Sequence, residues 1–139
     1  MIRLTAAQHQ FLIAAARAEH PHECCGLIIG HKEEQDWVID DLAASENLSP
    51  TPAQNFEVDM RLRLRLQKEL RGTGRRIIGH YHSHPDGTAK PSATDLKSAW
   101  EDDMVWIIVA VTAIEAELSA SVYSDAFSEF AKIDIQVTD

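Results

Sequence analysis

Residues 79–95 read GHYHSHPDGTAKPSATD, and this stretch decides how the middle of the chain folds. Residues 76–84 are rich in strand-forming side chains, and Pro85 ends the strand because proline has no N–H to donate to a neighbouring strand. A glycine-containing loop follows, and Ser92 is a good N-cap for a helix over residues 91–100. The stretch therefore predicts a strand, a turn and the start of a helix in close succession.

Three histidines alternate along this predicted strand. Side chains at i and i+2 share one face about 6.6 Å apart, so His82 and His84 can bind one ion at about 2 Å each. His80 faces the same way, but about 13 Å separate it from His84, too far for both to hold one tetrahedral ion. The turn can return Asp95 to the end of the strand. Two imidazoles and one carboxylate leave a zinc position open, which predicts a hydrolytic site.

Each part of this pattern also has a simpler interpretation. The histidines of an H-x-H on a strand are more often ordinary surface or core side chains than metal ligands. Ser92 and Asp95 also form a near capping box, in which Ser92 caps the helix and Asp95 complements its dipole. A general base cannot be chosen by spacing, although Glu23 precedes an apolar strand where an unpaired carboxylate is costly. The joint occurrence of these features is what favours the metal site.

The other segments follow the usual periodicities. Apolar residues at helical spacing predict helices, and alternating apolar and polar residues predict strands with one buried face. The run of arginines and leucines over residues 61–66 fits both periods, and its good helix formers favour a helix. The predicted elements are a helix over residues 5–19 capped by Thr5, hairpin strands over 24–29 and 37–42, a loop over 45–54, a helix from Asp59 that ends at Gly72 or Gly74, and strands over 105–112, 116–123 and 130–137.

Composition limits the class of protein. A chain of 139 residues, 45% hydrophobic and 25% charged, fits one globular domain over residues 1–139. A net charge of −9 disfavours nucleic acid and anionic lipid as partners. Cys24 and Cys25 are adjacent, which excludes a disulfide framework, and no signal peptide or membrane-spanning run is evident. We therefore expect a cytoplasmic protein.

The two motifs together resemble a known family. HECCGLIIG at residues 22–30, followed by the stretch at 79–95, resembles the JAMM (MPN-plus) metallopeptidases, whose pattern is an early Glu, then H-[ST]-H-P and S-x-x-D. The resemblance implies an α/β (α+β) domain with a mixed central sheet and flanking helices, similar to cytidine deaminases. It also implies one zinc ion per chain. The implied ligands are His82, His84 and Asp95, with Glu23 as general base for the bound water and Ser92 as oxyanion donor.

The resemblance also implies a class of substrate. Short stand-alone bacterial relatives act on ubiquitin-like sulfur-carrier proteins that end in Gly-Gly, and release a C-terminal cysteine or short extension. The loop over residues 45–54 is our candidate for one wall of the groove for that tail. His80 stands where many relatives carry a bulky apolar or aromatic residue, and we interpret it as a packing or supporting side chain. The acidic surface does not forbid a homodimer.

Rival functions fail on particular residues. His22 and Glu23 begin an H-E-x-x-H motif, but Gly26 replaces the second histidine, and the P-C-x-x-C of zinc deaminases is missing. A thiol peptidase built on Cys24 or Cys25 is disfavoured because an apolar strand raises the pKa of a thiol. The remaining alternative is a non-catalytic MPN scaffold, although such scaffolds typically lack the ligands that are present here.

Overall fold

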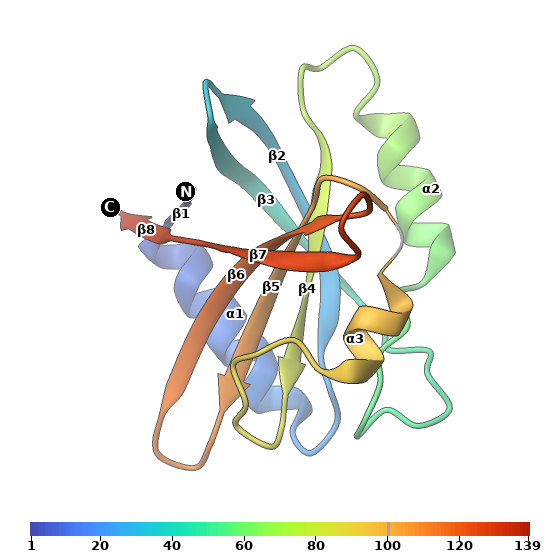
Figure 1. The fold of residues 1–139 in the computed structure, drawn as a ribbon, viewed down its shortest axis with the longest axis vertical. Helices are drawn as coiled ribbons and strands as arrows, with labels where there is room; N and C mark the ends of the chain where they lie inside the picture. The colour runs from blue at the N-terminus through green and yellow to red at the C-terminus, as the bar shows by residue number, and fades with distance from the viewer. Residues whose placement is uncertain (100) are drawn as a thin grey trace.

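The computed structural model describes residues 1–99 and 101–139. Within this part of the chain, one mixed sheet of eight strands and three helices form a single α+β unit, as predicted (Figure 1). The strands are β1 (Ile2–Thr5), β2 (Cys25–Glu33), β3 (Asp36–Ser45), β4 (Arg76–His84), β5 (Met104–Val111), β6 (Ala116–Ser124), β7 (Glu129–Ile133) and β8 (Ile135–Thr138). The helices are α1 (Ala6–Glu19), α2 (Met60–Glu69) and α3 (Ala93–Ser98).

The two long helices begin where the sequence predicts. Thr5 caps α1 in a capping box: its hydroxyl accepts the N–H of Gln8 at 3.1 Å, and the Gln8 side chain accepts the N–H of Thr5 at 2.9 Å. Asp59 caps α2 by accepting the N–H of Arg61 at 2.9 Å. The chain leaves α2 shortly before Gly72, whose φ of 75° lies in the left-handed region that favours glycine.

The third helix is shorter than the predicted range of residues 91–100. Ser92 is its N-cap, as expected, but α3 ends at Ser98 because Ala99 already has extended backbone angles. Trp100, the last residue of the prediction, lies outside the described residues. The start of the helix, which carries Asp95, is therefore confirmed, while its predicted length is wrong.

The end of the chain requires a correction. Residues 130–137 were expected to form one strand, but they form β7 and β8, which lie at opposite edges of the sheet. Only Asp134 separates them, and its carbonyl accepts the N–H of Ile2 at 2.8 Å. This contact joins the start of β8 to β1, a strand that the sequence did not predict. The alternation of side chains runs on through Asp134 without a glycine or proline, so nothing in the pattern marks the change of partner.

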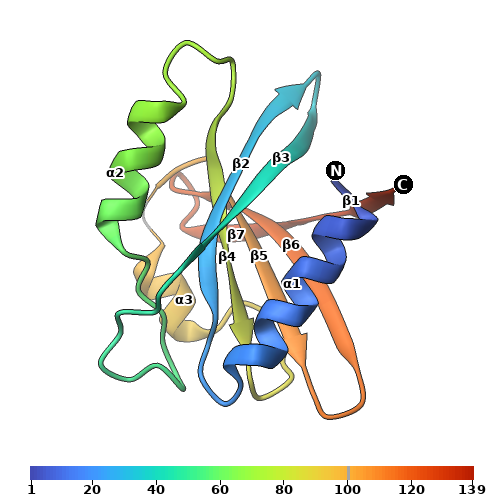
Figure 2. The ribbon, with the colours of Figure 1, turned by 180° about the vertical axis from the view of Figure 1, so that it is seen from behind.

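The order of strands is β7-β6-β5-β4-β2-β3-β1-β8, with β4 and β5 parallel at the centre. Helix α1 packs on one face of the sheet, and α2 and α3 lie on the other side (Figure 2). The central strand β5 is buried at every position, as its apolar sequence predicts. Among the described residues, no helix is long and apolar enough to cross a membrane.

Close packing of β4 against β5 depends on Gly79. A Cβ at this position would collide with the backbone carbonyl of Val105 in β5, so only glycine allows the two strands to pair here. The pairing of β4 with β2 also shifts by one residue between Ile28 and Ile29. Beyond this bulge the alternation is regular, and the three histidines of β4 share the face opposite to α1.

Candidate metal centre

His82, His84 and Asp95 meet at the end of β4. The two histidines come from the strand, and the carboxylate comes from the first turn of α3. The Nε2 atoms of the histidines lie 3.1 Å apart, and Asp95 Oδ2 lies 3.3 Å from that of His82 and 3.1 Å from that of His84. All three residues are buried. The turn over residues 85–91 therefore returns Asp95 to the strand, as the sequence predicts.

These distances fit a zinc ion. Ligand atoms bound tetrahedrally at about 2.0–2.1 Å lie about 3.3 Å from one another, close to the spacing of these three atoms. Glu23 is the fourth member of the group: ligand-type atoms of Glu23, His82 and His84 all lie within 4.8 Å of one another. The shorter separations belong to Asp95, so we favour Asp95 as the ligand and Glu23 as the group beside it. Nitrogen and carboxylate donors of this kind suit zinc.

The turn of α3 orients Asp95. Ser92 and Asp95 form a capping box: the N–H of Ser92 donates to Asp95 Oδ2 at 2.8 Å, and Ser92 Oγ accepts the N–H of Asp95 at 3.0 Å. The capping interpretation and the metal interpretation are therefore compatible, because the same carboxylate completes the capping box and faces the histidines. The Ser92 hydroxyl accepts in this bond, so its own hydrogen is free to donate elsewhere.

Neighbouring groups also fix the two imidazoles. His84 Nδ1 lies 2.8 Å from the carbonyl of Thr88, which can only accept, so Nδ1 carries a hydrogen, and in the neutral ring Nε2 has the lone pair that a metal ion needs. The ring of His82 stacks on Phe56, with centroids 4.2 Å apart and planes at 15°. His80 stands outside the group, with its ring centroid 6.0 Å from that of His82.

Glu23 lies where β2 begins, at the same end of the sheet as His84. It is buried, and burial raises the pKa of its carboxyl group to about 7, although the charge of His84 opposes part of this rise. Its backbone is held by the loop over residues 45–54: the N–H of Glu23 donates to Pro52 at 2.7 Å, and Asn47 Nδ2 donates to the Glu23 carbonyl at 2.9 Å. The loop is thus next to the candidate site.

The candidate ligands differ in their protonation states. Burial disfavours ionised Asp95, but hydrogen bonds from His82 and His84 outweigh this effect and hold the pKa of Asp95 well below its usual range. Burial lowers the pKa of His82, so this imidazole is neutral near pH 7. A carboxylate and a neutral imidazole are the protonation states that bind a metal ion.

Some residues of the site carry no sequence signal that could have revealed them. Phe56, Thr88 and Asn47 belong to irregular segments, and their contacts with the site depend on the folded path of those segments. The thiol alternative is disfavoured by the structure: Cys24 and Cys25 are buried, and burial raises both pKa values, that of Cys25 to about 12.

A family model described as prokaryotic homologs of the JAB domain matches residues 5–123. The chain belongs to this family. The resemblance to the JAMM (MPN-plus) group is therefore confirmed at the level of the family. The matched range of this JAB-domain protein includes Glu23 and the whole of residues 79–95.

Individual relatives agree with this assignment. The chain is 33% identical to a probable TtuB-protein conjugate cleaving protease of Thermus thermophilus over 81 residues, which are 58% of this chain and 51% of that protein. It is 28% identical to the CysO-cysteine peptidase of Mycobacterium tuberculosis over 99 residues, 71% of this chain and 66% of that protein. The matched part thus spans between about half and just under two thirds of these relatives.

A solved structure has the same fold over the whole chain. The solution structure of protein DSY2949 from Desulfitobacterium hafniense matches with a TM-score of 0.87 at 27% identity. The match covers 100% of this chain and 94% of that one. The arrangement of β4, the turn and α3 therefore belongs to a fold that this JAB-domain protein shares along its full length.

Proposed function

We propose that this JAB-domain protein is a zinc-dependent peptidase or isopeptidase. Its substrate is a ubiquitin-like sulfur-carrier protein, and it hydrolyses the amide bond that follows the carrier's C-terminal Gly-Gly. The observation that carries the proposal is the buried group of His82, His84 and Asp95, with ligand atoms 3.1–3.3 Å apart and Glu23 beside them. Each of these residues stands at a position that the family pattern requires.

The residues of the chain have separate roles in the proposed reaction. His82, His84 and Asp95 would hold one zinc ion, which when bound supplies a Lewis acid and an activated water. Glu23 accepts a proton and gives it to the departing nitrogen, a role that suits a carboxyl group buried beside the candidate ligands. The free hydrogen of the Ser92 hydroxyl donates to the carbonyl oxygen as negative charge develops there.

The proposed substrate rests on the relatives and on the shape of the site. One relative is named as a protease that cleaves TtuB-protein conjugates, and another as a CysO-cysteine peptidase. Similar proteins are thus named for releasing either a protein or a cysteine. A tail that ends in two glycines suits a buried centre, since glycine lets the backbone approach without a Cβ clash. Ala53 and Gln54 line a cavity with Glu23 and Ser92, so the loop over residues 45–54 would form the wall of the groove at the scissile bond, on the side of the departing group.

Mass spectrometry of a carrier substrate tests the proposal. A carrier that ends in Gly-Gly plus a C-terminal extension is incubated with the zinc-loaded protein, with and without a chelator. We expect a mass loss equal to the extension, which the chelator prevents and added zinc restores. A protein that binds no zinc and leaves every carrier intact would instead be a non-catalytic MPN scaffold.

A further inference from the structure

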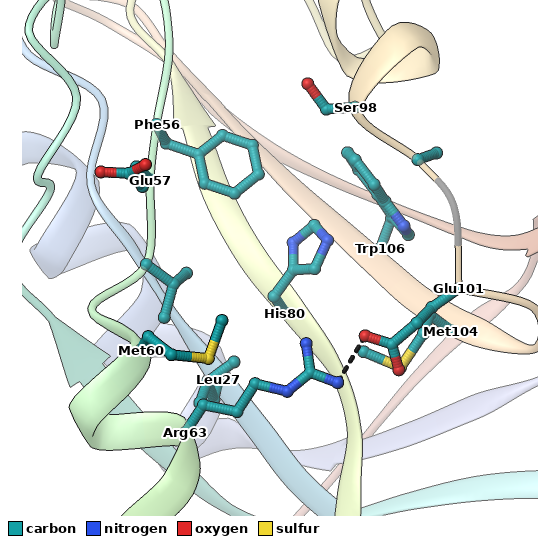
Figure 3. Close-up of a pocket in the computed structure, with 12 residues that line it drawn as sticks. Leu27, Phe56, Glu57, Met60, Arg63, His80, Ser98, Glu101, Met104 and Trp106 are labelled. Atoms are coloured by element: carbon teal, nitrogen blue, oxygen red, sulfur yellow. Dashed lines mark ion pairs between the residues drawn. The ribbon is translucent and has the colours of Figure 1, made fainter.

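A second cavity lies on the far side of His82 from Glu23. Its volume is about 360 Å³, within the range of roughly 300–1,000 Å³ that is typical of binding pockets. Figure 3 shows His80 projecting between Phe56 and Trp106, with Arg63 and Glu101 paired at one side. Most of the remaining wall is apolar, from Leu27, Val58, Met60 and Met104.

His80 is the polar group in this wall that lacks a partner. Its Nδ1 is shielded from solvent and, among the described residues, accepts and donates no hydrogen bond. The ring packs against Trp106 with centroids 4.1 Å apart and against Phe56 at 5.2 Å. A ring nitrogen left without a hydrogen bond in an aromatic cavity costs stability, and a ligand that supplied a partner would recover that cost.

The position of Glu23 gives the direction of the substrate. In the pairing of β2 with β4, Leu27 is opposite His80 and Cys25 is opposite His82, so Glu23 lies beyond them, next to His84. A group that protonates the departing nitrogen must lie within hydrogen-bond reach of it. The leaving group is therefore on the Glu23 side of the centre, and the carrier's tail extends the other way, toward His80.

We propose that this cavity holds the side chain of the carrier residue immediately before Gly-Gly, and that His80 hydrogen-bonds the backbone of the tail. The inference rests on the proposed function. Two residues of extended chain span about 6.6 Å, close to the 6.0 Å between the rings of His82 and His80, so a tail with its last glycine at the centre places that residue over His80. Phe56 contacts both rings and joins the cavity to the metal centre.

The walls select a large apolar side chain. Phe56 and Trp106 offer aromatic surfaces, and Met60 and Met104 adapt to irregular shapes. Arg63 is the only cationic side chain among the described lining residues, and it is already paired with Glu101. A carboxylate buried here would have no free cation, so carriers with Asp before Gly-Gly are disfavoured.

The test compares carriers that differ only at this position. With Phe, Leu, Ala or Asp before Gly-Gly, we expect kcat/KM to favour Phe and Leu over Asp on the order of 10²-fold. Short tail peptides should bind the Glu23→Gln protein with the same ranking, so that Phe and Leu peptides have a lower Kd than the Asp peptide. His80→Phe keeps the ring but removes both nitrogens, and should lower kcat/KM about tenfold for every carrier, mainly through KM, at unchanged zinc content.

A charge change at the cavity rim gives a matched pair of variants. Met60 and Leu64 lie on α2 and are each 59% exposed, but only Met60 lines the cavity. Because a cation at the rim attracts a carboxylate, Met60→Lys should improve the cleavage of the Asp carrier about tenfold relative to the Phe carrier, while Leu64→Lys leaves the ratio unchanged.

The outcomes separate the two proposals. Cleavage of all four carriers at equal kcat/KM would overturn the inference and leave the proposed function standing. Selective binding of Phe and Leu peptides without any cleavage would support the cavity and overturn the proposed function. If the protein neither cleaves the carriers nor binds the peptides selectively, both proposals are overturned.

Discussion

Tyr81 and His82 are neighbours in β4, yet they serve opposite faces of the sheet. Tyr81 is fully buried against α1, where its ring meets that of Phe11 edge to face at 6.4 Å. His82 is just as deeply buried but faces His84 and Asp95. The comparison teaches that burial serves two purposes in one strand. The face toward α1 packs the fold, and the other face buries ionisable groups whose desolvation a bound metal ion would offset.

The largest expected effect comes from removing a ligand. Asp95→Ala should abolish stoichiometric zinc binding and reduce carrier cleavage by on the order of 10³-fold or more, because the loss exceeds the 10–100-fold effect of outer contacts. Metal analysis and cleavage assays measure this, with Asp125→Ala as an exposed control. Retained zinc in Asp95→Ala would mean that the α3 carboxylate is only a helix cap.

Glu23→Gln should separate metal binding from chemistry. The amide has nearly the shape of the carboxylate but cannot accept the proton, so we expect kcat to fall about 10²–10⁴-fold at unchanged zinc content. Single-turnover cleavage of a carrier, combined with metal analysis, gives both quantities. Loss of the zinc together with the activity would make Glu23 a ligand rather than a base.

The same residue should make the metal-free protein sensitive to pH. The carboxyl pKa of Glu23 rises from 4.5 to about 7 on folding. Between these values the unfolded chain has lost the proton while the folded chain keeps it, so this contribution to stability decreases as pH rises through the window. In the wild type, this group should lower the free energy of unfolding by about 3 kcal/mol between pH 4.5 and 7, and Glu23→Gln should not show this decrease. Urea unfolding of both chelated proteins at pH 4.5 and 7 measures it, and parallel curves would contradict the assignment.

The smallest effect is expected on the face toward α1. The Tyr81 hydroxyl is buried and has no partner among the described residues. Tyr81→Phe removes this unsatisfied group and keeps the ring, so the free energy of unfolding should be unchanged or rise by about 1 kcal/mol, with normal zinc content. A fall in stability measured by urea unfolding would show that the hydroxyl is bonded in solution.

The sequence predicts the grouping of the candidate ligands better than it predicts the sheet as a whole. His82, His84 and Asp95 are separated by a strand repeat and a short turn, and local geometry alone brings them together. The site residue Glu23 comes from a distant segment. Its place before an apolar strand drew attention to it, but its role was implied by the family resemblance. Its present position depends on the pairing of β2 with β4.

Apart from the length of α3, the elements that were mispredicted are those that depend on distant partners. β1 is only four residues long and gains its partners from β3 and β8. Residues 130–137 keep one alternating pattern, but the chain changes from β6 to β1 as partner at Asp134. Phe56 lies in an irregular segment and reaches His82 only through the folded path of the chain. Periodicity reports which face of a segment is buried, but it does not report which strand lies beside it.

Anomalous diffraction at the zinc edge, from crystals grown with zinc, tests the central claim most directly. We predict one strong peak per chain, at about 2.0–2.1 Å from His82 Nε2, His84 Nε2 and an oxygen of Asp95, with the Glu23 carboxylate outside bonding distance. A peak bound by Glu23 with Asp95 turned away, or a peak elsewhere in the chain, would contradict the account.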